Sequence, residues 1–373
     1  MKDAAPTARV THRRRDHGAA QCVLDEAVRE GGVPGILAQV RDGGGHWTGT
    51  AGVADTRTGR ERGPEDRFRI GSITKTFTAT VVLQLAAEGR LALTDPVERW
   101  LPGILTGKAA HDGTTTTVRQ LLDHTSGIFN YTHDQSALRS QESCTPEELV
   151  AIAASHPADF PAGTGWAYSN TNYIVAGMIV ERVTGRTLTD EIADRITRPL
   201  RLTGTSLPLA TDPTLPSPHA RHYTRLFSPD PDAPVHDATE LDTTPYWAAG
   251  GMISTVGDLT RYFGALLGGQ LLRPEQQREL LTMVQTQNWL PRSTYGCGVS
   301  RLLLPSGTAV WGMGGALFGS WSYVYGTRDG THMLAVNINA DWTEGRWQDP
   351  IGIFTDLLEA EFSYGCALGF ALP

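Results

Sequence analysis

The sequence predicts an α/β fold of the α+β type, in which one antiparallel sheet is covered by helices and interrupted by a long helical insertion. Segments typical of strands lie near both ends of the chain, and glycine turns at Asp42-Gly43-Gly44-Gly45 and Asp329-Gly330 join them in pairs. Segments with apolar residues at helical spacing fill the middle. Strands from both ends need a common core, so we expect one sheet rather than two.

The first part of the chain is expected to form a hairpin between two helices. Residues 1–18 are predicted to be disordered, and a short helix follows over 20–29. The hairpin strands are expected at 35–40 and 46–53. A long apolar helix then runs from the region of Ser72 to the stop signal Glu88-Gly89-Arg90.

The rest of the chain is predicted to be helical first and to return to strands later. The expected helices are 118–123, one capped by Thr145, 173–183, 256–267 and 275–284, and the expected strands are 299–304, 308–311, 320–325 and 331–339, before a closing helix over 349–362. The proline-rich stretch 207–245 has little periodicity, which is typical of a functional loop. We therefore expect one catalytic unit over 19–363, with a sheet part (19–70 and 295–363), a helical part (71–294) and a tail over 364–373.

Composition and charge exclude several classes of function. A net charge of −8 argues against non-specific nucleic-acid binding, and no apolar stretch has the length of a membrane span. The chain has no phosphate loop, no His-Glu-x-x-His and no Gly-x-Ser-x-Gly, and its histidines are scattered, so we expect no metal and no cofactor. No apolar signal region follows Arg13-Arg14-Arg15, which predicts a cytoplasmic protein. Four cysteines without metal-ligand spacing are read as free thiols: Cys22, Cys144, Cys297 and Cys366.

The candidate nucleophile is Ser72 in Ser72-Ile73-Thr74-Lys75. At the start of a helix these two side chains share a face, and the first-turn N–H groups point at whatever Ser72 carries. A hydroxyl attacks well only when a neighbour takes its proton, and a lysine can do so when burial lowers its pKa. Lysine is rare here: of the 32 basic residues only Lys2, Lys75 and Lys108 are lysine. Arginine serves elsewhere, and it cannot give up its proton.

A second chemical element is Tyr168-Ser169-Asn170, which stands before an apolar helix. A tyrosine hydroxyl can relay a proton to a leaving group, and an asparagine amide can hold both a substrate carbonyl and the lysine. Taken alone, the tripeptide favours the simpler interpretation, an ordinary loop tyrosine followed by a helix-capping asparagine.

Together, Gly71-Ser72-x-x-Lys75, Leu121-Leu122-x-His124-Thr125-Ser126-Gly127 and Tyr168-Ser169-Asn170 resemble the serine D-alanyl-D-alanine carboxypeptidase and class C β-lactamase family of penicillin-recognising enzymes, in order and rough spacing. The resemblance implies a five-stranded antiparallel sheet flanked by helices, with an inserted helical subdomain. It also implies roles: Ser72 as nucleophile, Lys75 and Tyr168 as proton carriers, Asn170 as orienting group, the amides of Ser72 and Ala316 as oxyanion hole, Trp247 as cleft wall and His124 as a structural residue.

The third motif of that family is altered in this chain. Where the family has Lys or His, then Thr or Ser, then Gly, this sequence has Met313-Gly314-Gly315. Met313 cannot donate a proton or stabilise an anion. The arginine that the carboxypeptidases use nearby falls at Ser300, and Arg301 is one residue on, which reverses the face on a strand. We expect Met313, Gly314 and Gly315 to line a substrate site that has lost its partners for a carboxylate.

These observations predict an enzyme that forms an acyl-enzyme with a neutral ester or amide. It is expected to act as a hydrolase, such as an esterase, or as a transacylase that forms an amide with an amine acceptor in a biosynthetic pathway. Two alternatives stay open. One is a true D-alanyl-D-alanine carboxypeptidase or β-lactamase, and the other is a catalytically inactive ligand-binding homologue. The retention of Ser72, Lys75, Tyr168 and Asn170 favours an active enzyme over the second alternative.

Overall fold

The computed structural model describes residues 16–105, 111–136, 144–209 and 212–363. The predicted tail, 364–373, and most of the predicted disordered segment lie outside these residues. The first helix already begins at Gly18, so the expected boundary after residue 18 is too late.

The helices and strands follow the predicted order. The helices are α1 (Gly18–Arg29), η1 (Gly71–Ile73), α2 (Thr74–Ala87), α3 (Val97–Trp100), α4 (Val118–Leu122), η2 (Tyr131–His133), α6 (Pro146–Ala154), α7 (Asn170–Thr184), α8 (Leu188–Ile192), η3 (Ala193–Thr197), α9 (Trp247–Gly250), α10 (Val256–Leu267), α11 (Pro274–Leu280) and α12 (Pro350–Phe362). The strands are β1 (Gly35–Asp42), β2 (Gly45–Asp55), β3 (Arg60–Glu61), β4 (Phe68–Arg69), β5 (Tyr223–Thr224), β6 (His236–Asp237), β7 (Ile253–Ser254), β8 (Val284–Gln285), β9 (Ser293–Tyr295), β10 (Ser300–Leu303), β11 (Ala309–Leu317), β12 (Ser320–Gly326) and β13 (Met333–Ile338).

The main sheet is antiparallel and joins strands from both ends of the chain. Its order is β3-β2-β1-β13-β12-β11-β10-β9-β8, so it has nine strands rather than the five expected. The long strands β2-β1-β13-β12-β11 form the centre, and the short strands extend both edges. Strands of two or three residues, such as β3, β8 and β9, are too short to show periodicity in a sequence.

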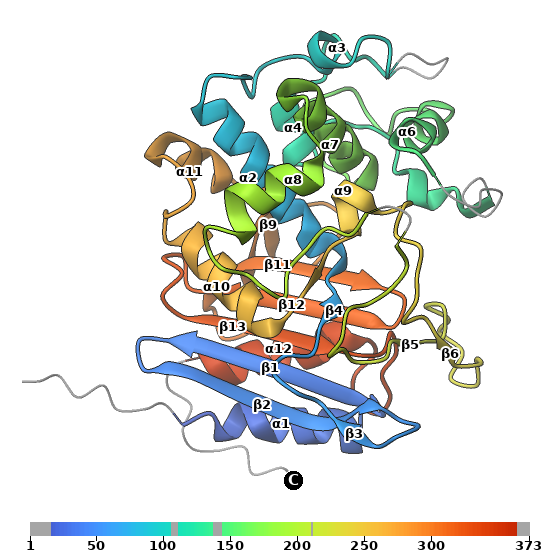
Figure 1. Cartoon of the computed structure of the whole chain (residues 1–373), viewed down its shortest axis with the longest axis vertical. Coiled ribbons are helices and arrows are strands. Elements are labelled where there is room, and N and C mark those ends of the chain that lie inside the picture. Colours follow the sequence, from blue (N-terminus) through green and yellow to red (C-terminus); the bar gives the residue numbers. More distant parts are fainter. Residues whose placement is uncertain (1–15, 106–110, 137–143, 210–211, 364–373) are drawn as a thin grey trace, which may run out of the picture.

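Helices cover both faces of this sheet. Figure 1 shows α1 and α12 on one side and α10, with the group around α2, on the other. One buried cluster packs α1 and α12 against the sheet, and a larger one joins the sheet to the inserted helices. Among the described residues no helix is both long and apolar enough to cross a bilayer.

Local signals explain most element boundaries. Thr145 and Glu148 form the reciprocal bonds of a capping box at α6, and Thr255 caps α10 at the expected position. Gly185 ends α7 in the left-handed conformation. The helix expected over 275–284 ends earlier, at Leu280, because the chain turns there and Val284 pairs with Tyr295 at the sheet edge.

The helix that carries the Ser-x-x-Lys motif lies in the centre of the insertion. Every residue of α2 from Thr74 to Leu83 is buried, and α7, α8, α9 and α11 all pack on it. A helix buried on all sides has no polar face, which explains its continuous apolar and threonine-rich sequence. Its position is fixed by both layers of the molecule, and so is the turn before it.

Candidate active site

Ser72 lies in the single turn η1, between β4 and α2, and this turn is seated against β11. Two glycines make the contact possible. A Cβ on Gly315 would lie 2.0 Å from the carbonyl oxygen of Ile70 and 2.8 Å from the amide nitrogen of Ser72. Gly71 has φ of +50°, and a Cβ there would lie 2.7 Å from the amide nitrogen of Ala316. The backbones are therefore in close contact where the amides of Ser72 and Ala316 lie.

Lys75 is fully buried, and its amine is held by three oxygen atoms. Its Nζ lies 3.0 Å from Ser72 Oγ, 2.6 Å from Asn170 Oδ1 and 2.7 Å from the carbonyl oxygen of Ala249. Burial lowers the pKa of Lys75 well below 10.5. A neutral amine has two N–H groups and one lone pair. Since Asn170 Oδ1 and the Ala249 carbonyl can only accept, those two take the N–H groups and the lone pair is left for the Ser72 hydroxyl.

Tyr168 lies beside Lys75 and Ser72. Its ring centroid is 4.9 Å from Lys75 Nζ, and its side chain lies close enough to that of Ser72 for Ser72 to lower its pKa in part. Burial raises the pKa of Tyr168 above its ordinary value, an effect that the neighbouring Ser72 side chain only partly opposes. The ring stacks on Trp289 and lies against His124. Tyr168 thus keeps its proton at neutral pH and is fixed by aromatic packing.

Asn170 and His124 hold the start of α7 beside Lys75. The Asn170 amide donates from Nδ2 to Thr132 Oγ1 at 3.2 Å, which orients Oδ1 toward the lysine. His124 is buried at φ of +64°, and its Nδ1 accepts hydrogen bonds from the Ser169 backbone and from Asn172 Nδ2. Burial lowers the pKa of His124 well below 6.5, so it is a neutral acceptor that positions the Tyr168-Ser169-Asn170 turn.

A cavity of about 750 Å³ opens in front of Ser72. Among the residues that the structure describes, its lining contains no Asp, Glu, Lys, Arg or His. It consists of Ser72, Thr132, Gln135, Asn170, Leu226, Phe227, Pro245, Tyr246, Ala249, Gly250, Ala316, Leu317 and Phe318. The polar groups gather around Ser72, and the far wall is apolar. Such a cavity suits a ligand that has an apolar part and no carboxylate.

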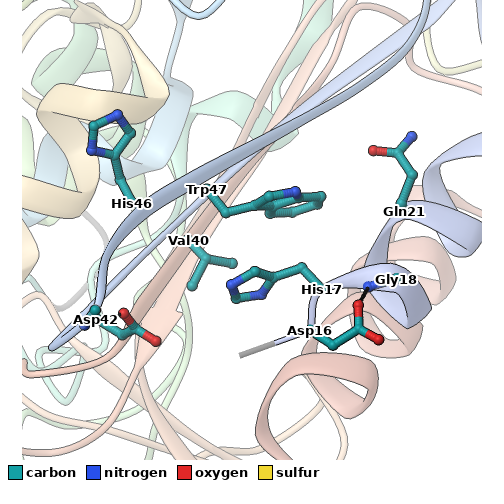
Figure 2. Close-up of a pocket in the computed structure, with 9 residues that line it drawn as sticks. Asp16, His17, Gly18, Gln21, Val40, Asp42, His46 and Trp47 are labelled. Carbon is teal, nitrogen blue, oxygen red and sulfur yellow. Dashed lines mark hydrogen bonds between the residues drawn. The ribbon is translucent and has the colours of Figure 1, made fainter. Parts of the chain in front are cut away.

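A second cavity, of about 360 Å³, lies on the opposite side of the sheet, between the start of α1 and the β1–β2 hairpin. Figure 2 shows the imidazole of His17 beside the ring of Trp47, and Asp16 bound to the backbone of Gly18. None of the predicted site residues lines it. Within the described part of the chain no group of three or more His, Cys, Asp or Glu side chains is arranged to hold a metal ion.

The sequence profile of the Beta-lactamase family matches residues 20–348. The chain belongs to the β-lactamase family. This confirms the resemblance inferred from the three motifs and, with the sheet and its helical insertion, the predicted α+β class.

Several solved structures are similar over nearly the whole chain. A D-stereospecific amidohydrolase from Streptomyces sp. superposes with a TM-score of 0.84 at 45% identity, covering 95% of this chain and 100% of that chain. The D-amino acid amidase of Ochrobactrum anthropi SV3, crystallised with L-phenylalanine amide, superposes with a TM-score of 0.79 at 27% identity over 92% of this chain and 97% of that chain.

Curated relatives match over shorter stretches. Esterase EstB of Burkholderia gladioli is 34% identical over 189 residues, which are 48% of this chain and 48% of the esterase. Penicillin-binding protein 4 of Amycolatopsis lactamdurans is 32% identical over 255 residues, 66% of this chain and 63% of that protein. The chain thus spans less than two thirds of the length of these two relatives. Their names and those of the structural neighbours support the prediction of an enzyme.

Within this β-lactamase-family site, the altered third motif lies differently from expectation. Met313 does not line the cavity, because its side chain is 1% exposed and packs into the core between the sheet and the helices. Gly314 faces the other way, since a Cβ there would meet the Tyr323 ring. Of the three, only Gly315 approaches Ser72. Strand alternation produces this pattern: 313 and 315 share one face and 314 has the other.

Trp247 also lies apart from the cavity. Its indole packs against Gly177 of α7 and borders a separate pocket with Cys144 and Leu207. The neighbouring Tyr246 lines the Ser72 cavity in its place. The sequence-based interpretation missed Tyr246 and the apolar wall of Leu226, Phe227 and Phe318. Its one relevant signal was the irregular stretch 207–245, which was predicted to be a functional loop and contributes part of this wall.

Proposed function

We propose that this protein is a Ser-x-x-Lys acyl-transfer enzyme that forms an acyl-enzyme at Ser72 with a neutral ester or amide. One observation carries the proposal: the Nζ of Lys75 lies 3.0 Å from Ser72 Oγ, while its two other partners can only accept hydrogen bonds. This geometry directs the lone pair of a neutral amine at the hydroxyl. Lys75 is then the base, and Tyr168 carries the proton onward.

The proposed steps conserve every proton and bond. Ser72 Oγ attacks the carbonyl carbon and its proton passes to Lys75 Nζ. The negative charge on the carbonyl oxygen is held by the Ser72 and Ala316 amides. The bond to the leaving group breaks, and the leaving alcohol or amine takes the proton from Lys75 through Tyr168. Water or an amine then attacks the acyl-enzyme by the reverse sequence and frees Ser72.

The cavity supports a substrate that has no carboxylate beside the scissile bond. A penicillin or a peptide with a terminal carboxylate needs cationic or hydroxyl partners beside the scissile bond, and each hydrogen bond to such a charged group contributes about 1.5–3 kcal/mol. Within the described part of the chain, no cationic side chain lines the cavity. The guanidinium of Arg301 lies 5.7 Å from the Trp311 ring centroid, and Arg301 borders another pocket. The hydroxyl of Ser300 forms a hydrogen bond with that of Tyr325. We therefore place this chain with the esterases and amidases rather than with carboxypeptidases or β-lactamases.

For the substrate, we propose the amide or ester of a D-configured amino acid. The structural neighbour with 45% identity is a D-stereospecific amidohydrolase, and the neighbour with 27% identity is a D-amino acid amidase. The acceptor is water in the hydrolase branch and an amine in the transacylase branch.

Three free cysteines among the described residues, Cys22, Cys144 and Cys297, agree with a reducing, cytoplasmic location.

Mass spectrometry after treatment with a fluorophosphonate tests the nucleophile. We expect an adduct on Ser72 that Ser72→Ala abolishes, while a β-lactam leaves no adduct. Lack of an adduct at any pH would support the inactive ligand-binding alternative. Acylation by penicillin at a rate comparable to an ester would support the β-lactamase alternative.

Paired substrates then test the finer proposals. We expect the amide and methyl ester of D-phenylalanine to be cleaved faster than those of L-phenylalanine. Adding an amine to the ester reaction separates the branches. An amide product indicates transacylation, and free acid alone rules that branch out. Equal rates for both enantiomers would refute the proposed stereochemical preference while leaving the acyl-enzyme mechanism intact.

A further inference from the structure

Two large apolar residues on the rim of the Ser72 cavity are both exposed and strained. Leu226 is 58% exposed and Phe227 is 45% exposed, and both line the cavity. Their φ angles are +57° and +56°. Consecutive bulky residues in the left-handed region are unfavourable, and they persist only where surrounding contacts hold them. Strain combined with exposed apolar surface points to a binding role.

The contacts that hold this turn converge on Asp341. Its carboxylate is 8% exposed and follows β13. It accepts hydrogen bonds from the backbone N–H of Arg225 at 2.9 Å, from that of Phe227 at 3.4 Å, and from the hydroxyl of Thr224. The same hydroxyl of Thr224 accepts from the N–H of Leu226 at 2.8 Å. One buried carboxylate thus binds, directly or through Thr224, the N–H groups of three successive residues.

The strained turn also packs against the strand end that carries the oxyanion amide. Gly319, in the turn after Ala316-Leu317-Phe318, has φ of +69°, and a Cβ there would lie 2.5 Å from the Tyr223 nitrogen. This close approach lets the ring of Phe227 contact that of Phe318, with centroids 5.3 Å apart. The wall is therefore tied to β11 as well as to Asp341.

We propose that Asp341 is a positioning residue that fixes Leu226 and Phe227 as the specificity wall for the acyl portion of the substrate, and that this acyl portion carries a bulky, uncharged, apolar group. The inference rests on the proposed function of Ser72. The acyl portion is assigned because Tyr168, which handles the proton of the leaving group, does not line this cavity, whereas Ala316, Leu317 and Phe318 do. A carbonyl bound at Ala316 therefore has its acyl side toward the wall.

Two esters with one leaving group isolate this effect. We compare p-nitrophenyl acetate with p-nitrophenyl 3-phenylpropanoate and measure kcat/KM and the pre-steady-state burst. Phe227→Ala and Leu226→Ala are expected to lower kcat/KM for the phenylpropanoate by about 10-fold, because apolar contact is lost, and to change the acetate by less than about 2-fold. Val235→Ala is the matched control, since Val235 is 51% exposed and does not line the cavity.

Asp341→Asn and Thr224→Val test the positioning role. Each variant removes a hydrogen-bond partner of the 225–227 backbone. We therefore expect each to lower kcat/KM for the phenylpropanoate ester, mainly through a higher KM, and to keep the burst with the acetate ester. A parallel loss for both esters would show a purely structural role and overturn the positioning role. An unchanged ratio of the two esters in Phe227→Ala and Leu226→Ala, with a normal burst, would overturn the specificity wall alone. If neither ester gives a burst or a Ser72 adduct, the proposed function fails and this inference falls with it.

Discussion

Replacement of Gly315 by alanine is the sharpest test of the site, because the added methyl group meets only backbone. It would lie 2.0 Å from the carbonyl oxygen of Ile70, 2.8 Å from the amide nitrogen of Ser72 and 2.9 Å from that of Ile73. An ordinary carbon–oxygen contact is about 3.3 Å, so β11 and the Ser72 turn have to separate by roughly 1 Å. That movement carries the Ala316 amide away from the position of the oxyanion.

The expected loss follows from the role of that amide. Removing one donor from an oxyanion hole lowers kcat by about 100- to 1,000-fold, and a displacement of about 1 Å in a catalytic group has an effect of about 100-fold. We therefore expect Gly315→Ala to lower kcat for p-nitrophenyl acetate by about 100-fold or more. Overpacking should also lower the free energy of unfolding by about 1–3 kcal/mol.

Gly314→Ala is the matched control on the same strand. A Cβ at Gly314 meets the ring of Tyr323, whose nearest atom is 2.7 Å away on the opposite face. A ring can turn aside where a backbone cannot, so we expect a far smaller loss of kcat. Steady-state kinetics and a urea melt on both variants check this. If Gly315→Ala keeps the kcat of the parent, or if Gly314→Ala loses as much, the proposed contact between β11 and the nucleophile is refuted.

Four further predictions concern the two proton carriers, the core and a helix cap. The burst rate should rise with pH through the pKa of Lys75, because only the neutral amine accepts the Ser72 proton. Burial lowers this pKa from 10.5. Lys75→Arg should lower the burst rate by about 100- to 10,000-fold. Tyr168→Phe should slow turnover but keep the same pH inflection, since burial raises the pKa of Tyr168 above its ordinary value; a shifted inflection would assign the titration to Tyr168 instead. Met313→His should lower the melting temperature, because an imidazole replaces a side chain that is 1% exposed, and it should not create acylation by penicillin; a gain of such acylation would mean that residue 313 reaches the substrate. Thr145→Ala should lower the free energy of unfolding by about 1 kcal/mol in a urea melt, since it removes the cap of α6, and a change within error would mean that the capping box contributes nothing.

Sequence reasoning succeeded where the chemistry is local. The spacing of Ser72 and Lys75 puts both on one side of the first helical turn, and Tyr168 and Asn170 flank the start of one helix. The structure brings all four together. One detail differs, because Ser72 lies in a short 3-10 turn before α2 rather than in α2 itself. The meeting of Ser72 with Tyr168, far apart along the chain, was predicted through the family resemblance and not through spacing.

The interpretation was less successful where position depends on a partner far away in the sequence. Trp247 and Tyr246 are adjacent aromatic residues, and only the docking of α9 on α7 decides which of them faces the cavity. Leu226 and Phe227 look like ordinary loop residues until Asp341, more than a hundred positions later, holds their backbone. For Met313 the alternation along β11 was readable, but the depth of its burial was not.

The seat of the Ser72 turn on β11 has a consequence for how activity arises during synthesis. In the proposed mechanism one oxyanion donor belongs to residue 72 and the other to residue 316, so Ser72 and Lys75 are translated long before the second donor. A growing chain that ends after α11 contains Ser72 and Lys75, but it lacks β11, on which the Ser72 turn packs. In that mechanism acyl transfer requires the last strands to have paired, so we expect a chain truncated before β11 to be inert toward esters and amides.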